Sequence, residues 1–158
     1  MRQVKLDRID RHILMDLQDN GRITNVALAR RAGISAPPCL RRVRALEEAG
    51  YIRGYHADLN PEALGFRVTV FAQIGLASQA ETDLKAFEDL VAGWPQVREC
   101  YMLAGETDFL LKIVGEDWDD YQRFLTTELT AAPNVSVVKT ALAIRESKRA
   151  PGIAIALD

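Results

Sequence analysis

Apolar residues repeat with two different periods along the chain, and the period changes near residue 66. Over 7–18 they recur every three or four positions, which predicts a first helix with one apolar face. Its apolar positions are Leu6, Ile9, Ile13, Leu14 and Leu17. Over 68–76 every second residue is apolar, which is typical of a strand. The pattern therefore predicts a helical part followed by a part that contains a sheet.

Two further helices are predicted between residues 24 and 50. Thr24 is a favourable N-cap for the first, and Gly33 provides the left-handed conformation with which many helices end. Ser35 is expected to cap the second helix, and Gly50 is expected to end it. The second helix is expected to turn three residues toward the core: Leu40, Val43 and Leu46. Two helices joined by a short glycine-containing turn, here over about 24–48, predict a helix-turn-helix whose second helix enters the major groove of DNA.

Arginines gather on the second helix of this pair, mostly off its apolar stripe. A run of charges on a helix is often only a solvated face, but here the turn, the caps and the basic face agree, which favours DNA binding. Arg30, Arg31 and Arg53 are expected to make weaker contacts with the DNA backbone. The complete set that we predict to contact DNA is Thr24, Arg30, Arg31, Ser35, Ala36, Pro37, Arg41, Arg42, Arg44 and Arg53.

The second part of the chain predicts the element order β-α-β-β-α-β, a ferredoxin-like arrangement. A capping box from Ser78 to Glu81 is expected to open its first helix. The later elements are expected as strands at about 97–104 and 107–114, a helix at about 117–130 and a strand at 135–145. The fold class is therefore α+β, with a winged helix-turn-helix followed by a ferredoxin-like domain.

The predicted sheet has apolar residues on both faces, although its two helices can cover only one of them. The residues that indicate this are Phe71, Tyr101, Leu103, Val138 and Leu142. A second copy of the same sheet is the simplest cover for the other face. We therefore expect a homodimer, and helix-turn-helix proteins commonly read two DNA half-sites as dimers.

The domain bounds follow from these patterns. Residues 51–59, YIRGYHADL, predict the short strands of a wing and complete an N-terminal domain over 1–60. Residues 61–66 are expected to form a linker that leads into the ferredoxin-like domain over 67–148, and 149–158 a C-terminal tail. Residues 1–60 hold 11 Lys and Arg against 7 Asp and Glu, whereas 61–158 hold 9 against 15. A basic end on an acidic chain suits a protein that turns one end toward DNA, with salt-dependent affinity.

Several classes of protein are disfavoured by the composition. No apolar run reaches the roughly 20 residues of a membrane span, and the N-terminus lacks the apolar core of a signal peptide, so we expect a cytoplasmic protein without a membrane partner. Cys39 and Cys100 have no metal-ligand spacing and are expected to be reduced, buried thiols. His12 and His56 have no catalytic or metal-binding partners nearby in the sequence. We therefore expect no enzyme, no metal and no cofactor.

Three motifs in this order resemble the Lrp/AsnC family of transcriptional regulators: LDRIDRHIL at 6–14, GISAPPCLRRVRALEEAGYIRGY at 33–55 and GETDFLLKI at 105–113. The resemblance covers the chain from Leu6 to about Lys148. It implies a winged helix-turn-helix and a sensing domain of the RAM type. It also implies dimers that associate into tetramers or octamers, and small effectors that are usually amino acids. The effector residues that we predict are Tyr101, Leu103, Gly105, Glu106, Thr107, Asp108, Trp118, Thr140 and Leu142.

The loop Gly105–Asp108 has two interpretations. From its residues alone it is a tight turn between strands, because glycine and aspartate are common in turns that bind nothing. The family resemblance favours an effector site, since glycine permits close approach of backbone donors to a carboxylate and aspartate accepts from an ammonium group. The alternative to an effector-responsive regulator is an architectural DNA-binding protein with little sequence preference. The ratio of operator affinity to random-DNA affinity distinguishes the two.

Overall fold

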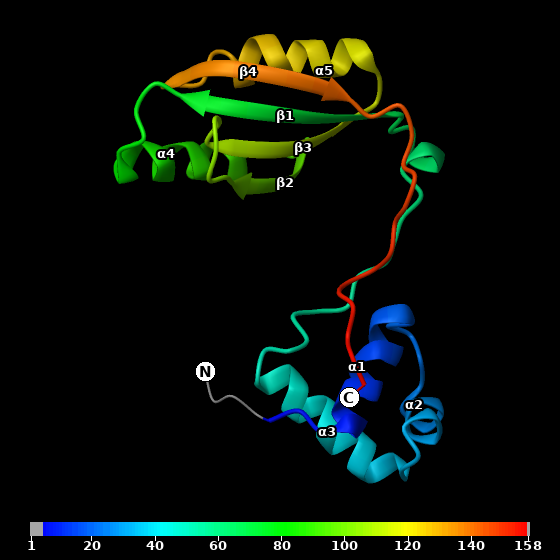
Figure 1. Cartoon of the computed structure of the whole chain (residues 1–158). Coiled ribbons are helices and arrows are strands. Elements are labelled where there is room, and N and C mark those ends of the chain that lie inside the picture. The colour runs from blue at the N-terminus through cyan, green and yellow to red at the C-terminus, as the bar shows by residue number, and fades with distance from the viewer. Residues whose placement is uncertain (1–4, 158) are drawn as a thin grey trace. The chain divides into compact units, whose positions relative to one another are not determined.

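The computed structural model describes residues 5–157, which divide into two units, each with its own core (Figure 1). The head unit contains the chain up to Asp58 together with the segment from Lys148 onward. The sheet unit is Leu59–Ser147. Residues 148–157, which we name the C-terminal strap, thus pack with the head unit and do not form a separate tail.

Three helices build the head unit: α1 (Arg8–Asp19), α2 (Asn25–Arg31) and α3 (Ala36–Glu48) (Figure 1). The buried centre consists of Ile13, Leu28, Ala29, Cys39 and Leu46. Thr24 is the N-cap of α2, and its side chain accepts a hydrogen bond from the backbone N–H of Ala27 at 3.2 Å. The three helices and this cap are as the sequence predicted.

The turns of the head unit depend on glycines at two predicted positions. Gly33 (φ 70°) follows α2 and Gly50 (φ 77°) follows α3, and both are left-handed. Other residue types adopt this conformation only at a cost of about 1–2 kcal/mol. The left-handed turn at Gly33 ends the chain's path along α2, and α3 begins three residues later, after its extended N-cap residue Ser35.

Two predictions about the head unit are wrong. Leu40 is 39% exposed, because the inward position of α3 belongs to Cys39, which is fully buried. The described residues 51–59 contain no strand, so the wing has no hairpin of its own. This segment is held by other contacts, among them a hydrogen bond of 2.9 Å from the Tyr55 hydroxyl to the Glu47 carboxylate. Burial and this carboxylate raise the pKa of Tyr55 to about 12.

The sheet unit has the predicted order of strands and helices and the sheet order β2-β3-β1-β4, all antiparallel, as in ferredoxin-like folds. A short 3-10 helix, Glu62–Leu64, precedes the sheet. The remaining elements are β1 (Val68–Leu76), α4 (Glu81–Ala92), β2 (Val97–Met102), β3 (Phe109–Gly115), α5 (Trp118–Phe124) and β4 (Val135–Leu142). Both helices contribute to one core on one face of the sheet, where Phe87 of α4 and Phe124 of α5 join Leu111 of β3.

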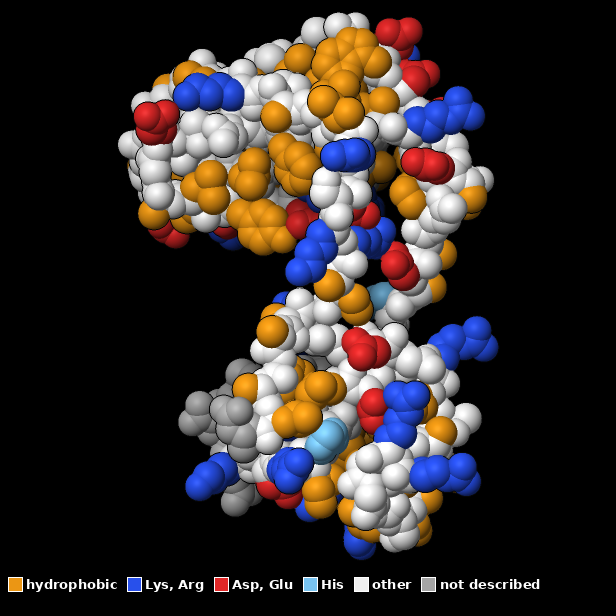
Figure 2. All heavy atoms as spheres, turned by 45° about the vertical axis from the view of Figure 1, so that its right-hand side comes forward, with side chains coloured by type: hydrophobic (Ala, Val, Ile, Leu, Met, Phe, Trp, Pro, Cys, Tyr) orange, Lys and Arg blue, Asp and Glu red, His pale blue; other side chains and the backbone are white. Residues whose placement is uncertain are grey.

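The face of the sheet without helices carries exposed apolar side chains. Phe71 of β1 is exposed, and strand register places Leu110 of β3 and Tyr101 of β2 on the same face. Figure 2 shows hydrophobic side chains at the surface of this unit on the side in view. Val138 and Leu142, which were among the residues that indicated two apolar faces, pair with Ile74 and Val70 and therefore lie on the helix-covered face.

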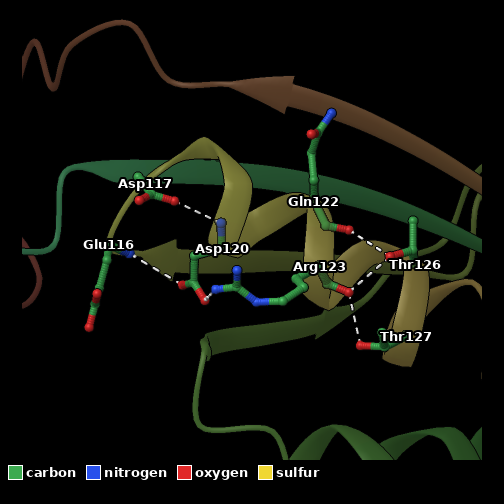
Figure 3. Close-up of polar contacts among 7 residues, drawn as sticks. All are labelled: Glu116, Asp117, Asp120, Gln122, Arg123, Thr126 and Thr127. Carbon is green, nitrogen blue, oxygen red and sulfur yellow. Dashed lines mark hydrogen bonds and ion pairs between the residues drawn. The ribbon is translucent and has the colours of Figure 1, made fainter.

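The N-terminus of α5 is fixed by acidic side chains (Figure 3). Asp117 accepts from the backbone N–H of Asp120 at 2.8 Å, while Asp120 accepts from the N–H of Glu116 and pairs with Arg123. A π-helical turn, Leu125–Leu129, continues this helix. There, threonine hydroxyls bond to carbonyls of the preceding turn, a contact that commonly bends helices. The predicted helix over 117–130 is therefore α-helical up to Phe124 and π-helical from Leu125 onward.

The predicted capping box of α4 is not formed. Ala80 is the N-cap and makes no side-chain hydrogen bond, since alanine has no acceptor. The Ser78 hydroxyl instead donates to the Asp83 carboxylate at 2.5 Å. Asn134, with its positive φ of 68°, also binds this region, because its amide accepts from the N–H of Ser78 and donates to its carbonyl. Side-chain hydrogen bonds of Ser78 and Asn134 thus stabilise the start of α4, which has no side-chain cap.

Candidate functional site

Helix α3 presents one exposed face built from residues three or four positions apart. Pro37, Leu40, Arg41 and Arg44 are all exposed and recur at the spacing of a single helical side. Arg41 and Arg44 are exposed cations on this face, and Leu40 adds an apolar group beside them. Arginine binds phosphates and guanine edges, and an apolar side chain contacts the methyl group of thymine. This face is therefore suited to the major groove of DNA.

Arg42 points the other way and has a role within the head unit. Its Nη1 donates at 2.7 Å both to Asp7 Oδ2 and to Asp10 Oδ1, at the N-terminus of α1. Asp10 is buried, and it also forms a reciprocal capping box with Asp7. Hydrogen bonds to Asp10 and Asp7 raise the pKa of Arg42. The Asp10 backbone N–H, more than Arg42, lowers the pKa of Asp7. Arg42 therefore fastens α3 to α1, which does not support its predicted contact with DNA.

The other predicted DNA contacts divide into exposed and engaged groups. Arg30 and Arg53 are exposed, while Arg31 pairs with Asp16 of α1 at 2.9 Å. The Ala36 carbonyl accepts from Asn25, and the Thr24 hydroxyl is used by its own helix. The engaged groups thus make contacts within the head unit, where Arg31 joins α2 to α1 and Asn25 joins α2 to α3.

The N-terminus of α3 is a weaker anion site than its position suggests. Ser35 is the N-cap and is exposed, and its hydroxyl caps no backbone N–H of its own helix. Pro37 and Pro38 have no N–H, so the first turn of α3 offers few backbone donors to a phosphate. A phosphate at this end would be bound mainly by the Ser35 hydroxyl and the Ala36 N–H.

The loop Gly105–Asp108 is anchored to the end of β1 by its aspartate. Asp108 Oδ2 accepts from the Leu76 N–H at 2.6 Å, and the Asp108 N–H donates to the Ile74 carbonyl at 2.8 Å. Thr107 is buried, whereas the Glu106 side chain is 91% exposed and lies 3.5 Å from Lys139. A Cβ at Gly105 would meet nothing within 4 Å. The chain's own packing therefore does not explain the glycine at this position.

A second group of predicted effector residues surrounds the start of α5. The Trp118 ring packs against the Tyr121 ring at a centroid distance of 5.3 Å and remains 42% exposed. The Tyr121 hydroxyl makes a hydrogen bond of 2.7 Å with the Thr140 hydroxyl. Leu142 is also exposed, near the end of the same strand. These side chains lie on the helix-covered side of the sheet, where Thr140 pairs with Ala72 and Leu142 with Val70.

Within one chain the two groups do not meet. The loop Gly105–Asp108 precedes β3, and Trp118 follows the end of β3 at Gly115. Because a strand rises about 3.4 Å per residue, the length of β3 separates them by roughly 20 Å. Tyr101 and Leu103 belong to the loop end of the sheet, since Tyr101 pairs with Leu110 and the Leu103 N–H donates to the Asp108 carbonyl.

Sequence reasoning missed two residues of these sites. Leu40 belongs to the exposed face of α3, and its spacing from Pro37 and Arg44 was the available signal. Lys139 contacts Glu106 from a neighbouring strand, which no local pattern reveals. In the described part of the chain, no group of three or more His, Cys, Asp or Glu side chains is placed to hold a metal ion. None of the described helices is long and apolar enough to cross a membrane.

Two family models match the chain in the order of its two units: a winged helix-turn-helix DNA-binding domain over 6–53 and the Lrp/AsnC ligand binding domain over 69–153. A leucine-responsive regulatory protein of Rhizobium meliloti is 57% identical over 148 residues, which is 94% of this chain and 95% of that protein. A Bkd operon transcriptional regulator of Pseudomonas aeruginosa is 43% identical, over 89% of this chain and 92% of that protein.

A solved transcriptional regulator of Neisseria meningitidis, in complex with L-methionine, has a TM-score of 0.91 at 35% identity and covers 95% of this chain and 97% of its own. These relatives are transcriptional regulators, which confirms the prediction that the chain is not an enzyme. With a DNA-binding helix-turn-helix in the head unit and an effector-binding domain in the sheet unit, the chain belongs to the Lrp/AsnC family of transcriptional regulators.

Proposed function

We propose that this regulator reads a specific DNA sequence through α3 and that an amino acid, or a close chemical relative, controls its binding. The observation that carries the first half is the exposed face of α3, which holds Leu40, Arg41 and Arg44, while Arg42 is bound to Asp10 of α1. A name that includes "leucine-responsive" in one relative and bound L-methionine in another support the second half.

The DNA half of the proposal is tested with a duplex that the wild-type protein selects from a random library. Arg41→Ala should weaken binding to this duplex by roughly 1–3 kcal/mol and relax one base position, while affinity for random DNA changes less. Arg98→Ala is the matched control, because it removes the same charge from an exposed position of the sheet unit. If Arg41→Ala binds the selected duplex as tightly as wild type, α3 is not the reading surface. Equal wild-type affinity for selected and random duplexes would indicate an architectural protein.

The effector half rests on the loop Gly105–Asp108. Asp108 uses one carboxylate oxygen to hold Leu76 and leaves the other as an acceptor for an ammonium group. Open space at Gly105, where no atom of the chain requires a glycine, is suited to the close approach of a ligand carboxylate. Since Trp118 and Leu142 lie toward the other end of the sheet, they contribute to the same site only if it forms between two copies of the chain.

Assembly is the third part of the proposal. The open face of the sheet, with Phe71, Tyr101 and Leu110, supports a homodimer, because an exposed apolar sheet face is normally covered. Dimers would then associate further, into tetramers or octamers. An effector bound between copies changes the assembly only if its affinity differs between assemblies, by a coupling energy of the order of 1–3 kcal/mol.

The effector is sought by thermal shift of the full chain with each of the twenty amino acids, because a ligand of the folded state raises its apparent stability. Asp108→Asn then tests the site: asparagine retains an acceptor for the Leu76 N–H but removes the charge that would bind an ammonium group. It should abolish the shift, whereas Glu128→Gln, at an exposed position of the π-helical turn, should leave the shift unchanged. A full response from Asp108→Asn would show that the effector binds elsewhere.

A further inference from the structure

The C-terminal strap packs with the head unit (Figure 1) and lines one side of a groove there. The groove is formed by α1, through Leu14, Leu17 and Gln18, and by the segment 51–56 that follows α3. Strap residues 153–156 complete its lining. Within the strap, Ile155 and Leu157 are partly buried, whereas Ile153, Ala154 and Ala156 are exposed.

The strap is bound mainly through its backbone. Gln18 Nε2 donates to the Ile153 carbonyl at 2.8 Å, and the Ile153 N–H donates to Gln18 Oε1 at 2.9 Å. This reciprocal pair is the pattern that a neighbouring strand would offer, supplied here by one side-chain amide of α1. Arg11 adds a hydrogen bond of 3.1 Å to the Ala156 carbonyl, and Arg149 pairs with Asp58.

Gly152 shows that the sequence of the strap is adapted to this groove. Its φ of 65° is left-handed, and a Cβ added there would lie 2.0 Å from Gln18 Oε1. A larger residue would therefore adopt a strained backbone conformation and displace the Gln18 amide from Ile153. The left-handed backbone favours glycine here, and so does the place of the Gln18 amide beside Ile153.

We propose that the strap is part of the DNA-binding surface: held on α1, it closes one side of the groove that the segment 51–56 also lines, and so positions this segment for a phosphate contact by Arg53. The segment has no strand partner within its own stretch of chain, and the strap lies along the same groove. Arg53 is exposed and borders that groove. Gln18 and Gly152 are then positioning residues, which act on DNA through Arg53. This inference rests on the proposed DNA binding of the head unit.

The strap also gives the sheet unit a second covalent connection to the head unit. Residues 143–147 separate the end of β4 at Leu142 from the strap, while the first connection runs through the linker before β1. The chain therefore connects β4 to the strap without passing through the helix-turn-helix.

The test measures DNA affinity of the full chain as a function of salt concentration. Each phosphate contact contributes about 0.9 to the slope of log affinity against log salt. Gln18→Ala and Gly152→Ala should each lower the slope by about one, as Arg53→Ala should. Combining Gln18→Ala with Arg53→Ala should cause no further change, because both remove the same contact. Two matched controls should retain the wild-type slope: Gln122→Ala, an exposed helical glutamine of α5, and Gly65→Ala, a left-handed glycine with nothing within 4 Å.

Hydrogen exchange provides a second readout that needs no DNA. Amide exchange in residues 51–56 should rise in Gln18→Ala and in a chain ending at Lys148, and a synthetic peptide of residues 149–158 should restore protection and slope to the shortened chain. Wild-type slopes in both strap variants, or additive effects of Gln18→Ala and Arg53→Ala, would overturn the inference. Arg41→Ala distinguishes failure of this inference from failure of the proposed function. If Arg41→Ala binds DNA as tightly as wild type, the proposal that α3 reads DNA is wrong, independently of the results for the strap variants.

Discussion

Replacing Arg42 with alanine should destabilise the head unit without removing a DNA contact. The guanidinium makes two hydrogen bonds of 2.7 Å to carboxylates, and its side chain is 34% exposed. Asp7 is half exposed, so this bond contributes little, as surface ion pairs usually do. The Asp10 side chain is only 10% exposed, and its Oδ1 would lose a charged donor in a site with little access to water. Together these losses amount to about 2 kcal/mol.

The two units can be followed separately during thermal unfolding. Both tryptophans, Trp94 and Trp118, lie in the sheet unit, so their fluorescence reports only that unit. Helical circular dichroism also reports the head unit, in which α1, α2 and α3 are the main elements. For a domain of this size, a loss of 1 kcal/mol lowers the midpoint by about 4–8 °C. Arg42→Ala should therefore lower the midpoint of the helical transition by roughly 8–16 °C and leave the tryptophan transition in place.

DNA binding by the same variant decides between the two roles of Arg42. At 25 °C, once corrected for the folded fraction, Arg42→Ala should bind the selected duplex within about twofold of wild type, a difference below roughly 0.5 kcal/mol. Arg41→Ala should show the reverse, with an unchanged midpoint and weaker binding. A stable Arg42→Ala protein that binds DNA tenfold less tightly would refute the reasoning, because the arginine would then have to leave its carboxylates to contact DNA.

Three further outcomes are expected. The Asp7 pKa lies below that of the unfolded chain, so the stability it contributes is present above about pH 4 and is lost as pH falls through the lower folded pKa; the free energies of unfolding of wild type and Asp7→Asn should therefore differ at neutral pH and converge as pH falls below about 4. Gly33→Ala should cost about 1 kcal/mol, since φ is 70° but nothing lies within 4 Å of the added Cβ; a loss above 3 kcal/mol in urea unfolding would contradict this. Under native conditions a thiol reagent should modify Cys100, which is exposed, much faster than buried Cys39, and equal rates would contradict the packing of α3.

The sequence predicted the structure best where a single local feature, such as a helix cap or a left-handed glycine, determines the conformation. Thr24, Gly33 and Gly50 define helix ends through caps and left-handed turns, and the structure has these features as predicted. The alternation over 68–76 likewise gave the central strand and its buried side, because the period of a strand is fixed by its backbone. The strand order β2-β3-β1-β4 then follows from the ferredoxin-like order of elements.

Predictions failed where neighbouring residues compete for the same position or the same partner. Cys39 occupies the inward position that the apolar pattern had given to Leu40. Ser78 has a cap-like sequence, but the Asp83 carboxylate engages its hydroxyl. Cys100 was expected to be buried and is exposed, because β2 lies at the edge of the sheet. In each case the deciding contact comes from packing that no single segment specifies.

Arg42 illustrates a more general limit on reading function from charge. In the sequence it is indistinguishable from Arg41, and both follow a plausible recognition pattern. What separates them is the D-x-x-D spacing of Asp7 and Asp10, some thirty residues earlier, which places two carboxylates at the start of α1 opposite α3. A capping box near a helix-turn-helix is therefore a reason to assign one arginine to the structure before counting the rest as DNA contacts.

The predicted effector residues do not come together within a single chain. The family resemblance collected Tyr101, Asp108, Trp118 and Leu142 into one site, yet a single chain places its loop and its Trp118 at opposite ends of β3. A ligand of amino-acid size cannot bridge roughly 20 Å, so the two groups act together only if another copy of the chain brings its own Trp118 to this chain's loop. An effector bound there would contact two chains at once. It would then stabilise one assembly over another by the full difference in those contacts, which is the physical requirement for assembly to respond to the effector.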